Sequence, residues 1–320
     1  MTEAQRKFRV QVVVAFGLVY VLWGSTYLGI RIAVEDIPPA MMGALRFLIS
    51  GSVMLAWCAL SGRRIKLSGR EFLHLGIIGV LLLTTGNVVL GWAETYIPSG
   101  LAALLIAITP LYFILLETLS SRGDHLSRRG LAGIALGVLG VIALLWPDIA
   151  RGMRVGGREL FGAALVLFSS FSWATGSVLS KRWHSQTDPY TSSAWEMTIA
   201  GVVNLLIAVS LGDHHHVTWA PRSMGAILYL VVAGSWVGFT AYIWLLRNVP
   251  TPKVATYAYI NPIVAVFLGW LVLGERITVN ILLGSVIIIV GVVLVTGAKL
   301  KPRERVPVEE PELPAVESDA

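Results

Sequence analysis

Long apolar runs separated by short polar segments dominate the hydropathy pattern of the chain. A helix rises about 1.5 Å per residue, so about 20 apolar residues cross the hydrocarbon core of a bilayer. Ten runs approach or exceed that length, and they cover residues 10–33, 40–60, 72–93, 98–119, 130–147, 159–182, 190–211, 223–246, 253–273 and 278–298. The pattern predicts an all-α integral membrane protein with ten transmembrane helices.

Polar and aromatic positions inside these runs recur in the second half of the chain. The segment that begins at Trp23 aligns without a gap with the segment that begins at Trp173. Further matched pairs are Arg31 and Lys181, Pro39 and Pro189, Trp92 and Trp244, Pro98 and Pro250, Pro110 and Pro262, and Gly140 and Gly291. Five crossings per copy force the second copy to be inverted relative to the first, an arrangement found in many secondary transporters. We expect the first repeat at 11–148 and the second at 159–298.

Composition and charge refine this picture. Hydrophobic residues make up 55% of the chain and charged residues 14%, which excludes an ordinary soluble domain. Placing the N terminus in the cytoplasm puts 18 of the 25 Lys and Arg residues in cytoplasmic segments, so we expect both termini there. The same bias accounts for the net charge of +6 without nucleic acid as a partner. The tail 299–320, rich in Pro and Glu, is expected to be disordered.

Several motifs resemble those of the EamA-type branch of the drug/metabolite transporter superfamily. They are Trp23-Gly24-Ser25, Arg31, Pro38-Pro39, Arg46-Phe47, and Pro262 followed by Gly274-Glu275-Arg276-Ile277-Thr278. The likeness spans residues 11–298 and departs from the family pattern at Arg122-Gly123-Asp124-His125, which has one residue more than the G-E-R element. The resemblance implies a ten-helix basket that exports small metabolites, with a central cavity lined mainly by helices 1, 3, 4, 6, 8 and 9.

Three ionisable residues inside the predicted helices each need a partner or a cavity. Arg46 lies about 9 Å from the outer end of helix 2, and we expect it to pair with Glu94 or with the loop at residues 35–36. Glu196, the equivalent of Arg46 in the second repeat, is expected to pair with one of Lys181, Arg182, Arg247 and Lys253. Ion pairs that fix helix packing and a direct role in coupling remain open alternatives for all three, and Glu94 is the candidate coupling carboxylate.

Aromatic and polar residues near the helix centres form the candidate substrate site. Trp23 and Trp173 are equivalent in the two repeats, and each stands one turn from Tyr27 or Ser177, so the pair would line a cavity symmetrically. Aromatic walls bind ring-bearing or cationic metabolites, although packing against lipid or another helix is the alternative for each ring. The full candidate set is Trp23, Tyr27, Asn87, Trp92, Tyr112, Trp173, Ser177, Trp236, Tyr257 and Asn261.

Prolines and glycines suggest where helices bend and where they pack closely. Pro110 and Pro262 are candidate hinges because each frees a carbonyl one turn earlier, although a bend that only serves packing is the alternative. Small-residue faces on helices 5 and 10 comprise Gly133, Gly137 and Gly140, and Gly284 and Gly291. They predict close helix packing or a homodimer contact through helices 5 and 10.

These features predict a multi-pass secondary transporter of the inner cell membrane. Its partners would be the lipid bilayer and a small organic substrate, such as an amino acid or a related amphiphilic or aromatic compound, exported by alternating access. We expect no enzymatic activity, catalytic residue, metal site or cofactor, since phosphate-cradling and catalytic motifs are missing from the sequence. The alternatives are a sugar-phosphate or nucleotide-sugar antiporter of the same superfamily and an intramembrane lipid-phosphate enzyme. The first needs more mid-membrane cations than Arg46, and the second needs clustered carboxylates.

Overall fold

The structure, a computed structural model, describes residues 3–120, 132–133, 135–143, 146, 157–183, 187–249 and 257–296. Every regular element in these ranges is helical. Among the described residues, six helical runs are long and apolar enough to cross a membrane, namely Gln5–Ala33, Pro39–Leu60, Gly69–Glu94, Arg158–Ser180, Pro189–Ser210 and Pro221–Tyr242. Shorter apolar helical stretches cover Ser99–Phe113, which includes a turn, Ile260–Leu273 and Val279–Gly291. The prediction of an all-helical membrane protein is confirmed at this level.

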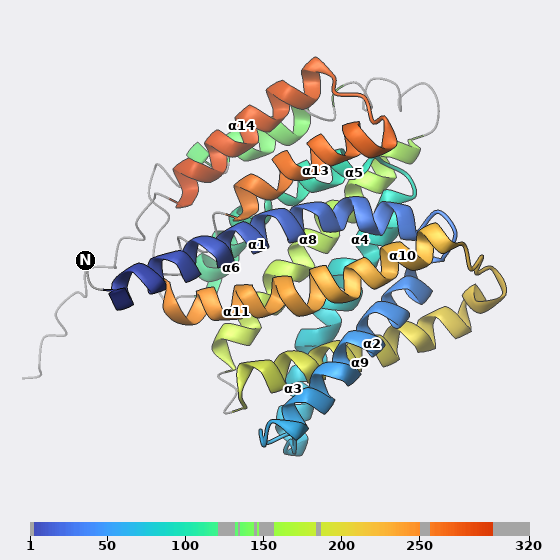
Figure 1. Cartoon of the computed structure of the whole chain (residues 1–320). Helices are drawn as coiled ribbons and strands as arrows, with labels where there is room; N and C mark the ends of the chain where they lie inside the picture. Colours follow the sequence, from blue (N-terminus) through green and yellow to red (C-terminus); the bar gives the residue numbers. More distant parts are fainter. Residues whose placement is uncertain are drawn as a thin grey trace, which may run out of the picture.

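The helices that the structure describes follow the predicted apolar runs in order (Figure 1). They are α1 (Glu3–Ala33), α2 (Pro39–Leu60), α3 (Gly69–Gly79), η1 (Val80–Val88), α4 (Val89–Glu94), α5 (Ser99–Ile106), α6 (Thr109–Ser120), α8 (Arg158–Arg182), α9 (Pro189–Ser210), η2 (Asp213–His215), α10 (Pro221–Tyr229), η3 (Leu230–Val237), α11 (Gly238–Asn248), α13 (Tyr257–Leu273) and α14 (Val279–Thr296). The predicted fifth run, 130–147, is described only in part, and the tail predicted to be disordered, 299–320, lies outside the described residues. The single span expected at 98–119 is instead two helices, α5 and α6. The chain turns at Ala107 and Ile108, directly before the Thr109-Pro110 pair, because proline cannot donate to the preceding turn.

Two π-helical segments, η1 and η3, interrupt the third and eighth predicted spans at equivalent places in the two halves. Just after each segment, a backbone N–H bonds the carbonyl five residues earlier, from Val89 to Thr84 and from Gly238 to Ala233. Wide turns of this kind disturb the regular register and occur often at functional sites. The hydropathy pattern does not predict them, since it looks the same for an α-helix and a π-helix.

The most extensive helix contact joins α2 to α9 and is reciprocal. A Cβ atom on Gly51 would lie 2.6 Å from the backbone nitrogen of Thr198, and one on Gly201 would lie 2.6 Å from the backbone nitrogen of Leu48. In the alignment of the halves Gly51 is equivalent to Gly201, and Leu48 to Thr198. The same contact therefore occurs twice, as expected where a local two-fold axis passes between α2 and α9.

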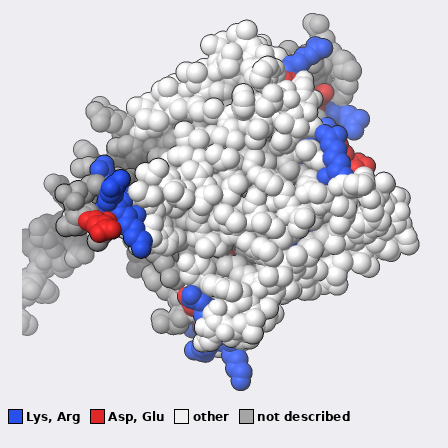
Figure 2. All heavy atoms as spheres, in the orientation of Figure 1, with Lys and Arg blue, Asp and Glu red and all other residues white. Residues whose placement is uncertain are grey.

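One face of the molecule carries its charges at the margins. On the face shown in Figure 2, Lys, Arg, Asp and Glu side chains gather at the edges, and a broad uncharged area lies between them. In the same orientation, α13 and α14 lie at one edge of the molecule, and α2, α3 and α9 lie at the opposite edge (Figure 1). An uncharged area between charged edges on this face suits a protein in contact with lipid.

The glycine faces predicted on helices 5 and 10 contact each other within one chain. A Cβ on Gly140 would lie 2.8 Å from the backbone nitrogen of Ile288, and one on Gly291 would lie 2.8 Å from the carbonyl oxygen of Gly133. The prediction of close packing is confirmed. A homodimer through these helices would have to use their outward faces, which on α14 expose Leu283, Val286, Val290 and Val293.

Candidate substrate site between the two halves

Trp23 and Trp173 occupy equivalent positions, as the repeat predicts. Each indole packs on a glycine of the opposite half. Trp173 packs on Gly86, which lies in η1, and Trp23 packs on Gly238, which directly follows η3. A Cβ on Gly86 would lie 3.3 Å from Cε3 of Trp173, and one on Gly238 would lie 2.9 Å from Nε1 of Trp23. The indole N–H of Trp23 also donates to the carbonyl of Gly234 in η3, at 3.2 Å. The two tryptophans therefore join the halves where the helical register changes.

An aromatic cluster surrounds Trp23 and combines three helices. The ring of Trp23 on α1 lies 4.7 Å from Tyr242 on α11 and 5.1 Å, edge to face, from Tyr257 on α13. Tyr242 and Tyr257 meet edge to face at 5.8 Å. Edge-to-face pairs of this kind stabilise a packed aromatic wall. Tyr242 was not among the predicted site residues, because its place one helical turn after Gly238 gains meaning only from the contact of that glycine with Trp23.

Arg46 does not form the predicted ion pair. Its guanidinium donates from Nη1 to Oδ1 of Asn87 at 3.1 Å and from Nε to Oγ of Ser235 at 3.3 Å, and both partners are neutral. Glu94 is not its partner. The loop at residues 35–36, the other predicted partner of Arg46, interacts with different residues. Glu35 lies 3.6 Å from Arg222, and the Asp36 carboxylate accepts a hydrogen bond from Ser223. The prediction was wrong because the rotation of α2 aims Arg46 at the two wide turns.

Glu94 is fully buried at the end of α4. Neither of its carboxylate oxygens has a hydrogen-bond partner in the described part of the chain, whereas its backbone carbonyl accepts from Arg31. Arg31, Glu275 and Tyr27 all lie within electrostatic reach of the carboxylate. Glu94 thus belongs to a charged cluster at this end of the helices, separate from Arg46.

Glu196 is buried in α9, and the ion pairs found among the described residues do not include it. Of the partners predicted for it, Lys181, Arg247 and Lys253 have side chains outside the described residues. The backbone of Glu196 packs against α3, where a Cβ on Gly79 would lie 2.6 Å from the Glu196 carbonyl oxygen.

The remaining candidates mostly join helices or satisfy local carbonyls. Trp236 donates from Nε1 to the Ser50 carbonyl at 3.2 Å, and the Ser177 hydroxyl donates to the Trp173 carbonyl at 2.8 Å. The Asn261 amide nitrogen is placed to donate to the carbonyls of Tyr20 at 3.2 Å and Tyr257 at 3.1 Å.

The other aromatic candidates pack against neighbouring side chains. Tyr112 meets Phe171 edge to face at 5.5 Å, and Tyr27 and Trp92 pack in the larger of the two clusters of buried apolar residues. The structure thus gathers Trp23, Tyr257, Asn87 and Trp173 around the wide turns and assigns Ser177 and Asn261 to backbone bonds.

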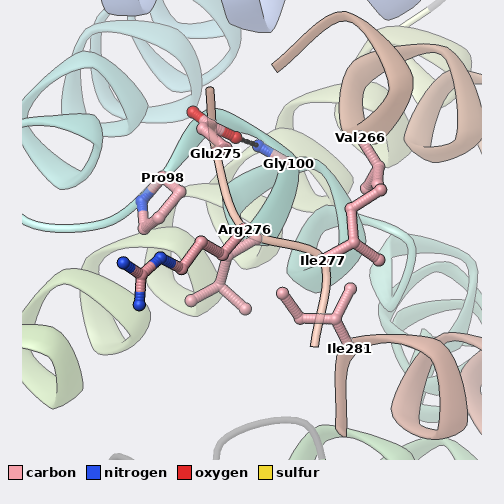
Figure 3. A pocket seen from close by; sticks show the side chains of 8 residues that line it. Pro98, Gly100, Val266, Glu275, Arg276, Ile277 and Ile281 are labelled. Carbon is pink, nitrogen blue, oxygen red and sulfur yellow. Dashed lines mark hydrogen bonds between the residues drawn. The ribbon is translucent and has the colours of Figure 1, made fainter. Parts of the chain in front are cut away.

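Polar networks tie loops together at both ends of the helices. At one end, Glu275 accepts from the backbone nitrogens of Ser99 and Gly100 at 2.8 and 3.0 Å, beside a shallow pocket that Pro98, Arg276 and Ile281 help to line (Figure 3). This pocket lies away from the predicted aromatic site, and the carboxylate in it is already satisfied.

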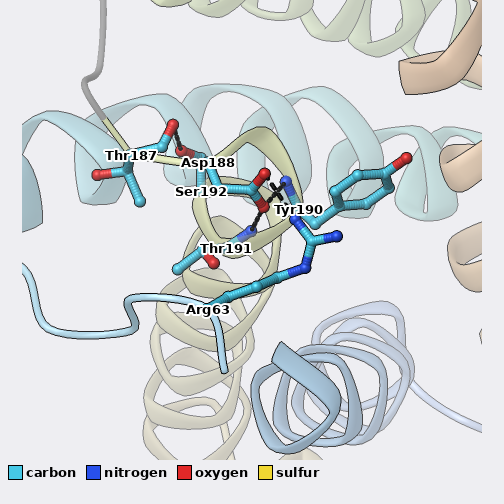
Figure 4. A network of polar contacts seen from close by, with 6 residues as sticks. All are labelled: Arg63, Thr187, Asp188, Tyr190, Thr191 and Ser192. Atoms are coloured by element: carbon cyan, nitrogen blue, oxygen red, sulfur yellow. Dashed lines mark hydrogen bonds and ion pairs between the residues drawn. The ribbon is translucent and has the colours of Figure 1, made fainter. Parts of the chain in front are cut away.

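At the other end, Arg63 contacts Asp188 at 2.7 Å, and Asp188 caps α9 through the nitrogens of Tyr190 and Thr191 (Figure 4). The guanidinium of Arg63 also stacks over the Trp57 and Tyr190 rings, with its carbon 5.1 and 4.9 Å from their centroids. The loop after α2 is thereby fastened to the start of α9.

The packing of Gly86 and Gly238 against the two tryptophans can be tested by alanine substitution. Alanine at Gly238 is expected to cost on the order of 2 kcal/mol of stability, because its Cβ would press on the Trp23 indole. An added Cβ would lie 2.9 Å from a backbone carbonyl oxygen at both positions, that of Leu81 for Gly86 and that of Ala233 for Gly238. Alanine at Gly86 is expected to cost less only because its nearest Trp173 atom would be 3.3 Å away. Thermal unfolding of the purified variants in detergent measures both. Equal losses would contradict the difference in packing.

Comparison with known proteins agrees with this architecture. The model of the EamA-like transporter family matches residues 11–146 and again 160–297. The chain is 38% identical over 285 residues to the uncharacterised inner membrane transporter YedA of Escherichia coli K12, covering 88% of this chain and 89% of YedA. It is 28% identical over 291 residues to a probable amino-acid metabolite efflux pump of Escherichia coli K12, covering 86% of this chain and 91% of the pump.

A solved crystal structure shares the fold with a TM-score of 0.63 at 17% identity, covering 89% of this chain and 97% of its own. The likeness to inner membrane transporters and the six membrane-length helices indicate a multi-pass protein of the inner membrane. The family model covers both halves that the structure joins through Trp23 and Trp173. The chain belongs to the EamA-like transporter family.

Proposed function

We propose that this transporter exports small organic metabolites, such as amino acids or related amphiphilic and aromatic compounds, by alternating access of its two halves. The proposed topology has ten crossings with both termini in the cytoplasm and repeats at 11–148 and 159–298. The observation that carries the mechanism is the reciprocal packing of Trp23 and Trp173 on the wide turns of the opposite halves. Sites between inverted repeats, built on interrupted helices, are a recurrent plan of secondary transporters.

Three features support motion around this site. The wide turns η1 and η3 already depart from α-helical register, as interrupted helices at functional sites often do. The break between α5 and α6 stands beside Pro110, and Pro262 lies inside α13. We propose both prolines as the hinges about which the halves rock.

The aromatic surroundings favour an organic substrate. Trp23, Tyr242 and Tyr257 form a wall suited to an apolar or ring-bearing body. A relative over most of the chain is named as a probable amino-acid metabolite efflux pump, which fits the same substrate class. A phosphorylated sugar would call for two or more cations at depth, whereas Arg46 is the one buried cation among the described residues with a resolved side chain.

We propose facilitated export, with Glu94 in a packing role. Glu94→Gln removes the charge and keeps the shape, so release of substrate is expected to persist in the variant. The variant is also expected to be at least as stable as the wild type, because a buried carboxylate without hydrogen bonds is costly. The measurement is release of a mixed amino-acid and aromatic-metabolite panel from liposomes that contain the purified protein, with and without a pH gradient.

Each result of that measurement has a distinct meaning. Release that a pH gradient drives and that Glu94→Gln abolishes would replace facilitated export with proton coupling at Glu94. Failure of the wild type to release any panel member under either condition would overturn the proposed export function. Impaired release together with a lower unfolding temperature in Glu94→Gln would contradict the expected stability.

A further inference from the structure

Arg46 is a buried cation without a counter-ion in the described part of the chain. Only 6% of the surface of Arg46 is exposed. Its hydrogen bond to Asn87 Oδ1 has an ordinary length of 3.1 Å, and its bond to Ser235 Oγ is long at 3.3 Å. Its carbon also lies 5.0 Å from the centroid of the Phe47 ring, a further weak interaction. These contacts compensate a buried guanidinium only in part, since a desolvated charge ordinarily requires an opposite charge.

The guanidinium lies where the two halves of the molecule meet. Asn87 belongs to η1 in the first half and Ser235 to η3 in the second. Gly234 leaves the space beside it, because a Cβ there would lie 3.1 Å from Nη2 of Arg46. No hydrogen bond joins Nη2 to any residue that the structure describes, so donors of this nitrogen remain for another acceptor.

The same glycine connects Arg46 with the aromatic cluster. Gly234 accepts the indole N–H of Trp23 through its carbonyl and approaches Arg46 through its α-carbon. A cation and an aromatic wall therefore border one residue of η3. This combination suits a compound that has a negative group at one end and an apolar or ring-bearing body at the other.

We propose that Arg46 is the anion subsite of the transporter and binds the carboxylate of a zwitterionic or anionic organic substrate. The inference rests on the proposed export function and narrows its substrate class. A guanidinium presents paired N–H donors that match the two oxygens of a carboxylate, and an anion there would supply the missing counter-charge. Since the contacts of Arg46 come from both halves, binding there is sensitive to how the halves are arranged.

The test compares substrates that differ by one carboxylate. Liposomes containing the purified protein are loaded with phenylalanine or with phenethylamine, and release is followed for wild type, Arg46→Gln and Arg46→Lys. Arg46→Gln is expected to reduce phenylalanine release about 10- to 100-fold, the usual effect of losing hydrogen bonds to a charged group, and to spare phenethylamine. Arg46→Lys keeps the positive charge but lacks the paired N–H donors of the guanidinium. Its rate of phenylalanine release is expected to lie between those of the wild type and Arg46→Gln. Arg70→Gln, an exposed charge loss on α3, is the matched control.

Binding gives a second readout that does not depend on transport. The unfolding temperature of the purified protein is measured with phenylalanine, phenethylamine or sodium chloride. Stabilisation by phenylalanine alone, lost in Arg46→Gln, supports the subsite even if no release occurs, in which case only the export function fails. Where Arg46→Gln does not fold, the same comparison is made with Arg46→Lys.

Three results would overturn the subsite. The first is an equal loss of phenylalanine and phenethylamine release in a stable Arg46→Gln protein, which would make Arg46 a brace between η1 and η3. The second is stabilisation by chloride as strong as by phenylalanine, which would assign the position to an inorganic ion. The third is the lack of both release and stabilisation by phenylalanine in the wild type.

Discussion

Replacing Gly51 and Gly201 together by alanine is expected to prevent stable folding of the transporter. Each new Cβ would lie 2.6 Å from a backbone nitrogen of the facing helix, Thr198 for Gly51 and Leu48 for Gly201. Backbone atoms cannot swing aside as the end of a side chain can, so α2 and α9 must separate along their most extensive contact. Overpacking of this kind costs on the order of 3 kcal/mol per site, a large part of the stability of a typical protein.

The measurement is detergent-induced unfolding of the purified single and double variants. Gly17→Ala and Gly225→Ala are the matched controls, since an added Cβ meets nothing within 4 Å at either helical position. They are expected to leave stability unchanged or raise it by up to about 1 kcal/mol, because alanine is the better helix former. Single variants at Gly51 and Gly201 as stable as these controls would show that α2 and α9 do not pack this closely.

Replacing Glu275 by alanine is expected to lower the free energy of unfolding by on the order of 3 kcal/mol. One carboxylate oxygen accepts from both the backbone nitrogen and the hydroxyl of Ser99, each at 2.8 Å, and the other accepts from the Gly100 nitrogen at 3.0 Å. Its removal leaves the start of α5 without acceptors and without a negative charge at the positive end of the helix. The turn between α13 and α14, where Gly274 takes a φ of 67°, would also lose its attachment to α5.

Two further variants separate these contributions. Glu275→Gln keeps an acceptor oxygen and is expected to lose about half as much as Glu275→Ala. Arg276→Gln changes the exposed neighbour and is expected to stay within about 0.5 kcal/mol of wild type. Thermal unfolding in detergent measures all three. If Glu275→Ala unfolds at the same temperature as Arg276→Gln, the Glu275 bonds to α5 do not contribute to stability.

The sequence alone was sufficient for the helical membrane class and for the equivalence of the two halves. Apolar runs of membrane length require helices, since a lipid-exposed backbone must satisfy its own hydrogen bonds. The alignment of Trp23 with Trp173 predicted equivalent surroundings, and both rings pack on equivalent glycines. The break before Pro110 was also foreseeable as a bend, because proline removes a backbone donor.

Only the tertiary structure decided which polar groups meet. Depth along a helix suggested Glu94 for Arg46, but partners also depend on the rotation of each helix about its axis, and hydropathy leaves that rotation undefined within a nearly uniform apolar run. The wide turns change this rotation locally and bring Asn87 and Ser235 to the guanidinium. Glu275 and Ser99 are likewise far apart in the chain and meet only because α13 packs on α5. Membrane crossings follow from local composition, whereas the partners of buried charges follow from how the crossings turn toward one another.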